Sequence, residues 1–295
     1  MGKIAIEVRG LHKRYGDKIV LSGIDLAVPA GTVFALLGRN GAGKTTLIHI
    51  LSTLASADAG EVRIAGRDLS SDANGVRGAI SLTGQFAAVD AMLTGRENLH
   101  MLCRLSGLSP SASRQRTAEL LDAFDLKDAA GKRVGSYSGG MRRRLDLALS
   151  LVRPKPVLFL DEPTTGLDAM SRRALWTMIR KLREQGMTIF LTTQYLEEAD
   201  ELADQIAVLA DGRLIASGSA SELKARFGEA VIEISNDDDV IIRTLPTDGT
   251  IQDVNRALQE ALRIVPANAK VAIRQPSMED VFLALTGREE EVAVG

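Results

Sequence analysis

The stretch that decides the fold is GRNGAGKTT, residues 38–46. It contains the pattern Gly-x-x-x-x-Gly-Lys-Thr, follows the apolar run TVFALL (32–37) and precedes the helix-like TTLIHILSTLAS (45–56). A glycine-rich turn between a buried strand and a helix points backbone N–H groups inward and adds the positive end of a helix, and both bind phosphate. The alternative, a plain turn, does not explain this strand–helix context.

The side chains of this loop have defined chemical roles. Lys44 can reach the outer phosphates of a nucleotide, and the Thr45 hydroxyl can ligate Mg²⁺. The residues that we expect around the nucleotide phosphates are Gly38, Asn40, Gly41, Ala42, Gly43, Lys44, Thr45 and Thr46.

A second segment, VLFLDEP (157–163), supplies carboxylates at the end of an apolar strand. Asp161 would emerge at the strand tip, near the metal, and Glu162 is the natural candidate for activating water. An isolated Asp-Glu pair is equally compatible with a helix cap or a solvated turn. Beside a complete phosphate-binding loop, the catalytic interpretation is favoured.

The bulk composition excludes several classes of function. The 295 residues are 45% hydrophobic and 25% charged, with a formal charge of -2, which is ordinary for a soluble domain and predicts no nucleic-acid partner. The lone Cys103 excludes an internal disulfide, and three His leave little material for a soft metal site. No run approaches the roughly 20 apolar residues that span a bilayer, so we expect no direct membrane span.

Periodicity along the chain outlines the elements. We expect strands over 3–37 and at 61–66, a turn-rich stretch to Gly78, and helices over 94–130 with Thr94 as N-cap and Glu97 at the capping-box distance. Gly186 should end a helix, and Asp211-Gly212 should form a hairpin turn. Beyond about Ala220 the pattern changes to strands at 229–245 and 270–275, helices at 251–265 and 276–287 (with Ser277 as N-cap), and a frayed tail from 288.

The motif YSGGMRRR (137–144), placed between the phosphate loop and DEP with its following TTGLD, decides the class. This order resembles the ATP-binding subunits of ABC transporters over about residues 3–225. The resemblance implies an α/β fold of the P-loop NTPase type. It comprises a mixed or parallel sheet core, an antiparallel β subdomain and an α-helical subdomain at about 86–152, all within an ATP-binding domain at 1–225. Residues 226–295 would form a small C-terminal α+β appendage.

The resemblance also implies roles for single residues. Tyr15 would stack on adenine, Gln85 would ligate Mg²⁺ and couple the nucleotide to the membrane partner, and Asp168 would communicate across the dimer. Together with Thr45 and Asp161, Gln85 would complete the Mg²⁺ site.

The Ser-Gly-Gly segment opens a helix, whose free N–H groups suit an anion. The resemblance implies that Ser138, Gly139 and Gly140 bind the γ-phosphate held by the other subunit, so that a homodimer encloses two ATP molecules. ATP would stabilise that closed state because only it provides both halves of the site.

The sequence departs from the family pattern at three places. Tyr137 and Met141 flank Ser-Gly-Gly, where phosphate contacts need only the backbone. We expect 142–144 to form a solvated helix face with one or two pairing partners rather than a nucleic-acid patch. Gln194 stands where the family usually has His, and a glutamine amide can still donate to a phosphate oxygen but cannot carry a proton. We therefore expect Glu162 to be the catalytic base, with Lys44 and Gln194 positioning groups.

Two further segments, TTQYLEEADELAD (192–204) and PSMEDVFLALTGRE (276–289), resemble the daunorubicin-resistance type of subunit. That likeness implies an ATPase that powers export of a hydrophobic, drug- or antibiotic-like compound through a separate transmembrane permease. The chain would be cytoplasmic, on the inner face of the membrane. The appendage would serve dimer contact and regulation, or merely cap the domain.

Two other classes compete with this interpretation. A regulatory or translation-type ABC ATPase without a membrane partner usually joins two cassettes, and this chain has one phosphate loop. A P-loop kinase or GTPase would leave Ser-Gly-Gly unexplained, and no guanine-specific Asn-Lys-x-Asp element is visible.

Overall fold

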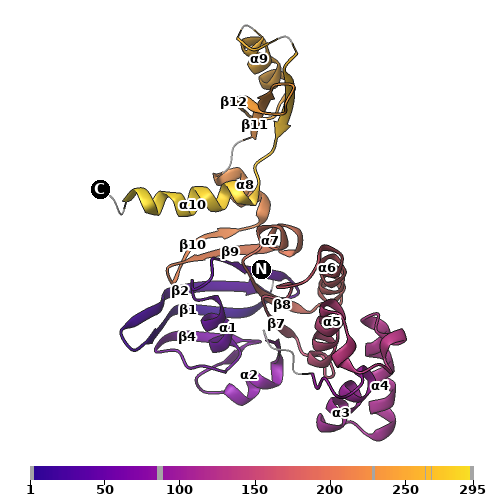
Figure 1. Ribbon diagram of the computed structural model, residues 1–295. Helices are drawn as coiled ribbons and strands as arrows, with labels where there is room; N and C mark the ends of the chain where they lie inside the picture. The colour runs from indigo at the N-terminus through magenta and orange to yellow at the C-terminus, as the bar shows by residue number, and fades with distance from the viewer. Residues whose placement is uncertain (1–2, 85–88, 228–229, 263, 267, 293–295) are drawn as a thin grey trace. The chain divides into compact units, whose positions relative to one another are not determined.

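The computed structural model describes residues 3–84, 89–227, 230–262, 264–266 and 268–292 (Figure 1). The chain forms two compact units, 1–215 and 216–295. This division falls inside β10 (Arg213–Gly218), whereas the sequence suggested a boundary at 225/226, inside α8 (Ala220–Phe227). The reason is that α8 packs against the terminal helix α10 (Met278–Val292) of the second unit.

An antiparallel sheet begins the first unit. Its order is β2-β1-β4-β5, and the strands are β1 (Ile4–Tyr15), β2 (Lys18–Pro29), β4 (Ala59–Ile64) and β5 (Arg67–Asp68). Along β2, buried and exposed residues alternate from Ile24 to Val28, which confirms the expected period of two for that part of the strand.

A six-stranded sheet forms the centre of the first unit. Its order is β10-β9-β3-β8-β7-β6, and the remaining strands are β3 (Val33–Leu37), β6 (Ile80–Thr83), β7 (Val157–Asp161), β8 (Thr188–Thr193) and β9 (Gln205–Ala210). Every residue of β3, β7 and β8 is buried, as expected for parallel strands covered on both faces. Phe34 and Phe190 stack at 5.2 Å within this core. The parallel register brings the carboxyl ends of β3, β7 and β8 to one edge.

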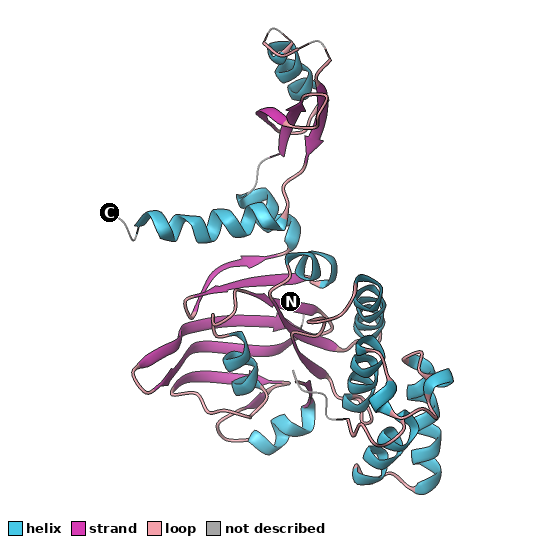
Figure 2. Cartoon of the chain, viewed as in Figure 1, coloured by secondary structure: helices cyan, strands magenta, loops and turns pink. Residues whose placement is uncertain are grey.

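The described helices of the first unit are α1 (Lys44–Leu51), α2 (Ala73–Ala79), α3 (Gly95–Leu105), α4 (Pro110–Ala123), α5 (Gly139–Ser150), α6 (Ala169–Glu184) and α7 (Leu196–Leu202), with short 3-10 helices at Lys127–Ala129 and Val134–Ser136. Some of these helices flank the six-stranded sheet, whereas α3 and α4 pack on each other and on α5, away from the sheet (Figure 2). The predicted capping box is confirmed, since Glu97 N–H donates to Thr94 Oγ1 and Thr94 N–H to Glu97 Oε2. Gly186, at φ 87°, ends α6 as predicted.

Helix α2 was not expected, because the sequence suggested only turns up to Gly78. Asp72 caps this helix by accepting from Gly75 N–H at 2.9 Å, and Val76 buries its side chain. The segment has two glycines among seven residues, and because glycine has a low helix propensity, the sequence did not indicate a helix there.

The second unit has its own small core. The sheet order is β12-β11-β13, with β11 (Ala230–Ser235), β12 (Ile241–Thr247) and β13 (Lys270–Arg274). Helix α9 (Ile251–Ala261) covers Ile232 and Ile234. The predicted cap Ser277 is confirmed by the bond from Asp280 N–H. Helix α10 runs to Val292, however, so the expected frayed tail from 288 is wrong. None of the described helices is long and apolar enough to cross a membrane.

Candidate nucleotide-binding site

The phosphate loop lies between β3 and α1, where the sequence placed it. Gly41 and Gly43 adopt φ of 85° and 110°, which L side chains rarely tolerate. At Gly43 a Cβ would also come within 2.9 Å of Val20 O, and at Gly38 within 2.5 Å of Leu209 O. These glycines are therefore required by backbone conformation and by close packing.

The Lys44 side chain is only 3% exposed and points back over the loop. Its Nζ donates to Gly38 O at 2.8 Å and to Arg39 O at 3.2 Å, and it lies 3.2 Å from Glu162 Oε1. The ammonium is thus held at the loop beside a carboxylate from another strand end.

Asp161 ends β7 and is 2% exposed. Its Oδ1 accepts from Thr192 Oγ1 at 2.6 Å and lies 3.5 Å from Thr45 Oγ1. The structure therefore brings together Asp161 and Thr45, two of the residues expected around Mg²⁺. Gln85, the third, lies outside the described residues.

Glu162 adopts an uncommon backbone conformation, with φ at 45°. A non-glycine residue in this region costs about 1–3 kcal/mol and persists only where its surroundings fix it. Glu162 N–H donates to Thr192, at 3.0 Å to Oγ1 and 3.2 Å to O, and its Oε2 accepts from Thr165 Oγ1 at 3.3 Å. In this conformation the carboxylate lies 3.2 Å from Lys44 Nζ.

A hollow of about 330 Å³ joins these groups, lined by Val20, Asn40, Gly41, Gly43, Lys44, Thr45, Thr46 and Glu162. A site of this size accommodates a small polar ligand. Six of the predicted loop residues therefore line the same cavity as the predicted base.

Gln194 follows β8, and its neighbour Thr193 accepts the Gly38 N–H at 3.2 Å. Gln194 therefore directly follows the residue that is hydrogen-bonded to Gly38, the first residue of the phosphate loop. Its half-buried side chain is not among the described residues that line the hollow.

Tyr15 ends β1 with its ring 53% exposed, and Lys13 Nζ lies 5.1 Å from the ring centroid. An exposed ring at a strand end can stack on a planar ligand.

The Ser-Gly-Gly segment begins α5. Ser138 is the N-cap, and its Oγ accepts from Met141 N–H at 3.2 Å. A Cβ at Gly140 would clash with Ser171, whose N–H donates to Asp168 at 2.8 Å. The bonds from the Ser171 backbone and hydroxyl also hold the pKa of the Asp168 carboxyl below its usual value.

The starts of α5 and α6 are therefore packed together, apart from the phosphate loop. Figure 1 shows α5 well separated from α1. The described lining of the hollow contains no residue of α5.

Arg143 and Thr192, which contact the site, were not predicted from the sequence as site residues. The expectation of a solvated face over 142–144 is wrong for Arg143, whose side chain is 12% exposed. Burial lowers the pKa of its guanidinium, while Asp146, Asp161 and Glu198 counteract that effect. Thr192 could have been found from the hydroxyl pair Thr192-Thr193 at the strand end.

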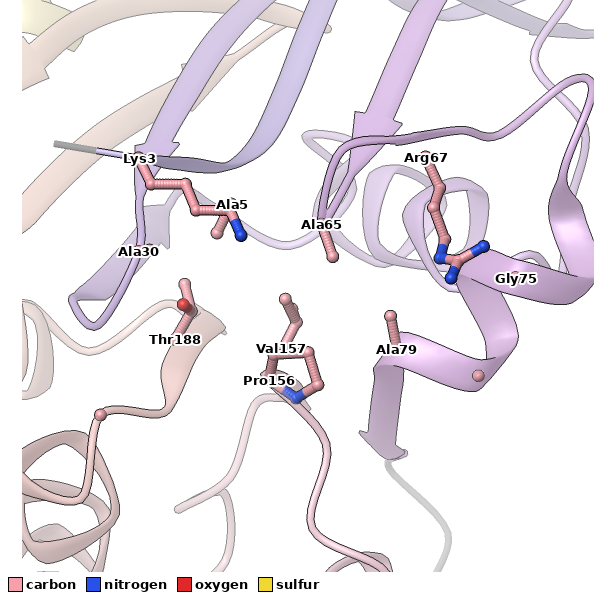
Figure 3. A pocket seen from close by; sticks show the side chains of 12 residues that line it. Lys3, Ala5, Ala30, Ala65, Arg67, Gly75, Ala79, Pro156, Val157 and Thr188 are labelled. Atoms are coloured by element: carbon pink, nitrogen blue, oxygen red, sulfur yellow. The ribbon is translucent and has the colours of Figure 1, made fainter.

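A larger hollow, about 530 Å³, opens at the amino ends of β7 and β8 (Figure 3). Figure 3 shows it walled by small side chains such as Ala5, Ala65 and Ala79, with Lys3 and Arg67 at its rim. None of the predicted site residues that the structure describes lines it. It therefore lies at the end of the sheet opposite to the phosphate loop.

Comparison with known proteins shows what this chain is similar to. The family model described as ABC transporter matches residues 21–165. The daunorubicin resistance ATP-binding protein DrrA3 of Streptomyces coeruleorubidus is 47% identical, over 99% of both chains. The Nod factor export ATP-binding protein I of Burkholderia orbicola is 39% identical over 98% of this chain and 99% of its own. Among solved structures, cbiO1 from Clostridium perfringens, part of the ABC transporter complex cbiONQ, aligns with a TM-score of 0.70 and 25% identity, covering 75% of this chain and 91% of its own.

Proposed function

Because the chain belongs to the ABC transporter family of ATP-binding subunits, whose members hydrolyse ATP, we propose that it powers export of a hydrophobic, drug- or antibiotic-like compound through a separate transmembrane permease. The observation that carries the ATPase site is the approach of Lys44 to Glu162 at 3.2 Å beside the phosphate loop. Two relatives that match nearly end to end are named for drug resistance and for export.

The chemistry would be positioning and electrostatics. Lys44 and the loop N–H groups bind phosphate oxygens, and Glu162 orients the attacking water. Tyr15 stacks on the adenine, and Gln194 donates its amide to the γ-phosphate.

The residues at the end of β7 fit a Mg²⁺ ion. Magnesium prefers hard oxygen ligands, and Thr45 Oγ1 and Asp161 Oδ1 lie 3.5 Å apart at the loop. Gln85 would be a further ligand. When bound, the ion neutralises charge on the phosphates, while Thr192 holds the Asp161 carboxylate in place.

We propose that the complete site forms between two copies of this chain. The hollow is lined by the loop and Glu162, whereas Ser138, Gly139 and Gly140, at the start of α5, are not among its described lining residues. The N-terminal N–H groups of the 12-residue helix α5 supply an anion site for the partner's γ-phosphate.

Mixing two inactive variants tests this arrangement. Lys44→Ala damages the phosphate loop, and Gly139→Glu places a negative charge at the start of α5, where a Cβ meets only Leu167 at an ordinary 3.7 Å. If sites are shared, the mixed dimer contains one site with both intact halves, so activity returns on mixing. If each copy encloses its own nucleotide, the mixture stays as inactive as either variant.

We place the permease contact on the helical subdomain. Met92, Met101 and Leu105 are 70%, 44% and 75% exposed. Met101 and Leu105 share one face of α3, four residues apart. Contact there would hold the chain at the inner face of the cell membrane.

Co-purification with the co-encoded membrane protein tests this contact. Met101→Glu and Leu105→Glu should each reduce co-purification several-fold and leave ATP binding unchanged. Leu54→Glu, at an apolar residue whose exposure (63%) lies between those of Met101 and Leu105, is the matched control. In liposomes holding both proteins, a transported drug should stimulate ATP hydrolysis; a rate indifferent to all hydrophobic compounds tried, with the permease present, would count against export.

A further inference from the structure

Arg143 connects α5 to the end of β7 through an unusual set of bonds. Its Nε donates to Pro163 O at 2.9 Å, and its Nη2 to Asp161 O at 3.2 Å. These two carbonyls flank Glu162 in the chain. The guanidinium therefore holds the backbone on both sides of the residue that we propose as the catalytic base.

The remaining bonds of Arg143 reach two other elements. Nη1 donates to Gly84 O at 2.8 Å, just beyond the end of β6, and to Asp146 Oδ2 at 3.2 Å on α5 itself. Asp146 is 5% exposed at its side chain and balances the buried charge. A planar guanidinium can serve several acceptors in fixed directions at once, which an ammonium cannot.

This arrangement explains how Glu162 keeps its strained conformation. Thr192 fixes the Glu162 N–H, and Arg143 fixes the carbonyls before and after it. A residue in the left-handed region persists where several contacts determine it together. We propose that Arg143 is a positioning residue that holds the Asp161–Pro163 backbone so that the Glu162 carboxylate meets the nucleotide, an inference that rests on the roles proposed above for Asp161 and Glu162.

Arg143→Lys is the direct test, because it keeps the charge and loses the planar set of donors. We expect kcat to fall roughly tenfold to hundredfold, as misplacement of a catalytic group does, with the KM for ATP and the affinity for an ATP analogue within about twofold. Arg144→Lys is the matched control. Arg144 is the next residue of α5 and also binds carbonyl groups, Phe124 O and Asp125 O, but within the helical subdomain.

Two further measurements separate positioning from a loss of folding. In Arg143→Ala, millimolar methylguanidinium should restore part of kcat, and it should do nothing for Glu162→Gln. Amide hydrogen exchange over 162–167, where Thr165 N–H donates to Glu162 O and Leu167 N–H to Thr164 O, should accelerate about tenfold in Arg143→Lys and not in Arg144→Lys.

The outcomes distinguish this inference from the proposed function. Unchanged kcat and unchanged exchange in Arg143→Lys overturn the role of Arg143, as does an equal loss in Arg144→Lys. A wild-type protein without ATPase activity, combined with accelerated exchange in Arg143→Lys alone, supports the positioning role and overturns the proposed site chemistry instead.

Discussion

Lys44 Nζ and Glu162 Oε1 lie 3.2 Å apart, so the cation expected to bind phosphate and the carboxylate expected to orient water are paired with each other. Both side chains are largely buried, at 3% and 12% exposure. An incoming triphosphate has to compete with Glu162 for the ammonium. Binding of the nucleotide would thereby release the carboxylate toward the γ-phosphate.

Glu162→Gln should remove both the competitor and the base. We expect turnover to fall about 10²–10⁴-fold, the usual contribution of a positioned general base, while ATP binding tightens or stays unchanged. The variant should therefore accumulate as an ATP-bound dimer. Size-exclusion chromatography with ATP and Mg²⁺ measures this, and elution as monomer alone would count against the base assignment.

Lys44→Ala should weaken ATP binding about tenfold or more, because a charge-assisted bond to phosphate is lost. Fluorescence titration with a labelled ATP analogue measures the affinity. Lys155→Ala is the control, since Lys155 also donates to a carbonyl, Arg77 O at 2.7 Å, at the opposite end of β7. Equal affinities in both variants would remove the phosphate loop from the site.

Variants at Gln194 test whether the side chain at this position transfers a proton or only orients other groups. Gln194→Ala should lower turnover severalfold to tenfold, because a donor to the phosphate is lost. Gln194→His keeps a donor and should be close to wild type. Steady-state rates at saturating ATP decide the matter, and equal rates in the two variants would mean that the amide does not touch the phosphate.

Glu198 should make stability depend on pH. Its carboxyl is 1% exposed and accepts from Trp176 Nε1 at 3.1 Å. Burial raises its pKa above the usual 4.5. The folded chain then holds this proton at pH values where the unfolded chain has lost it, so stability falls as pH rises through the folded-state pKa.

Glu198→Gln keeps an acceptor for Trp176 and removes the charge. Relative to wild type, its Tm should therefore improve as pH rises from about 5 to about 8, and the gain should vanish in acid. Glu198→Ala should cost about 1–3 kcal/mol, because it leaves the indole N–H without its acceptor. Thermal unfolding across this pH range measures both variants. A Tm difference between Glu198→Gln and wild type that does not change with pH would contradict a raised pKa for Glu198.

Much of the site could be predicted from the sequence because its parts are local. The phosphate loop, the Asp161-Glu162 pair and the helix start at Ser-Gly-Gly each depend on a few adjacent residues with fixed backbone requirements. Helix α2 escaped prediction because its glycines have low helix propensity, and tertiary packing of Val76 outweighs that propensity.

The sequence by itself determined most of the elements, α2 excepted, and which chemistry each strand end carries, since short-range steric rules and periodicity fix those. Only the tertiary structure decided which of these ends meet. Parallel registers bring Asp161 opposite Thr192 and Leu37 opposite Thr193, and so gather groups from 38 to 194 at one edge. The same packing turned Arg143, which looks like one of three surface arginines, inward to the backbone around Glu162, because a buried guanidinium must find acceptors and those carbonyls are within its reach.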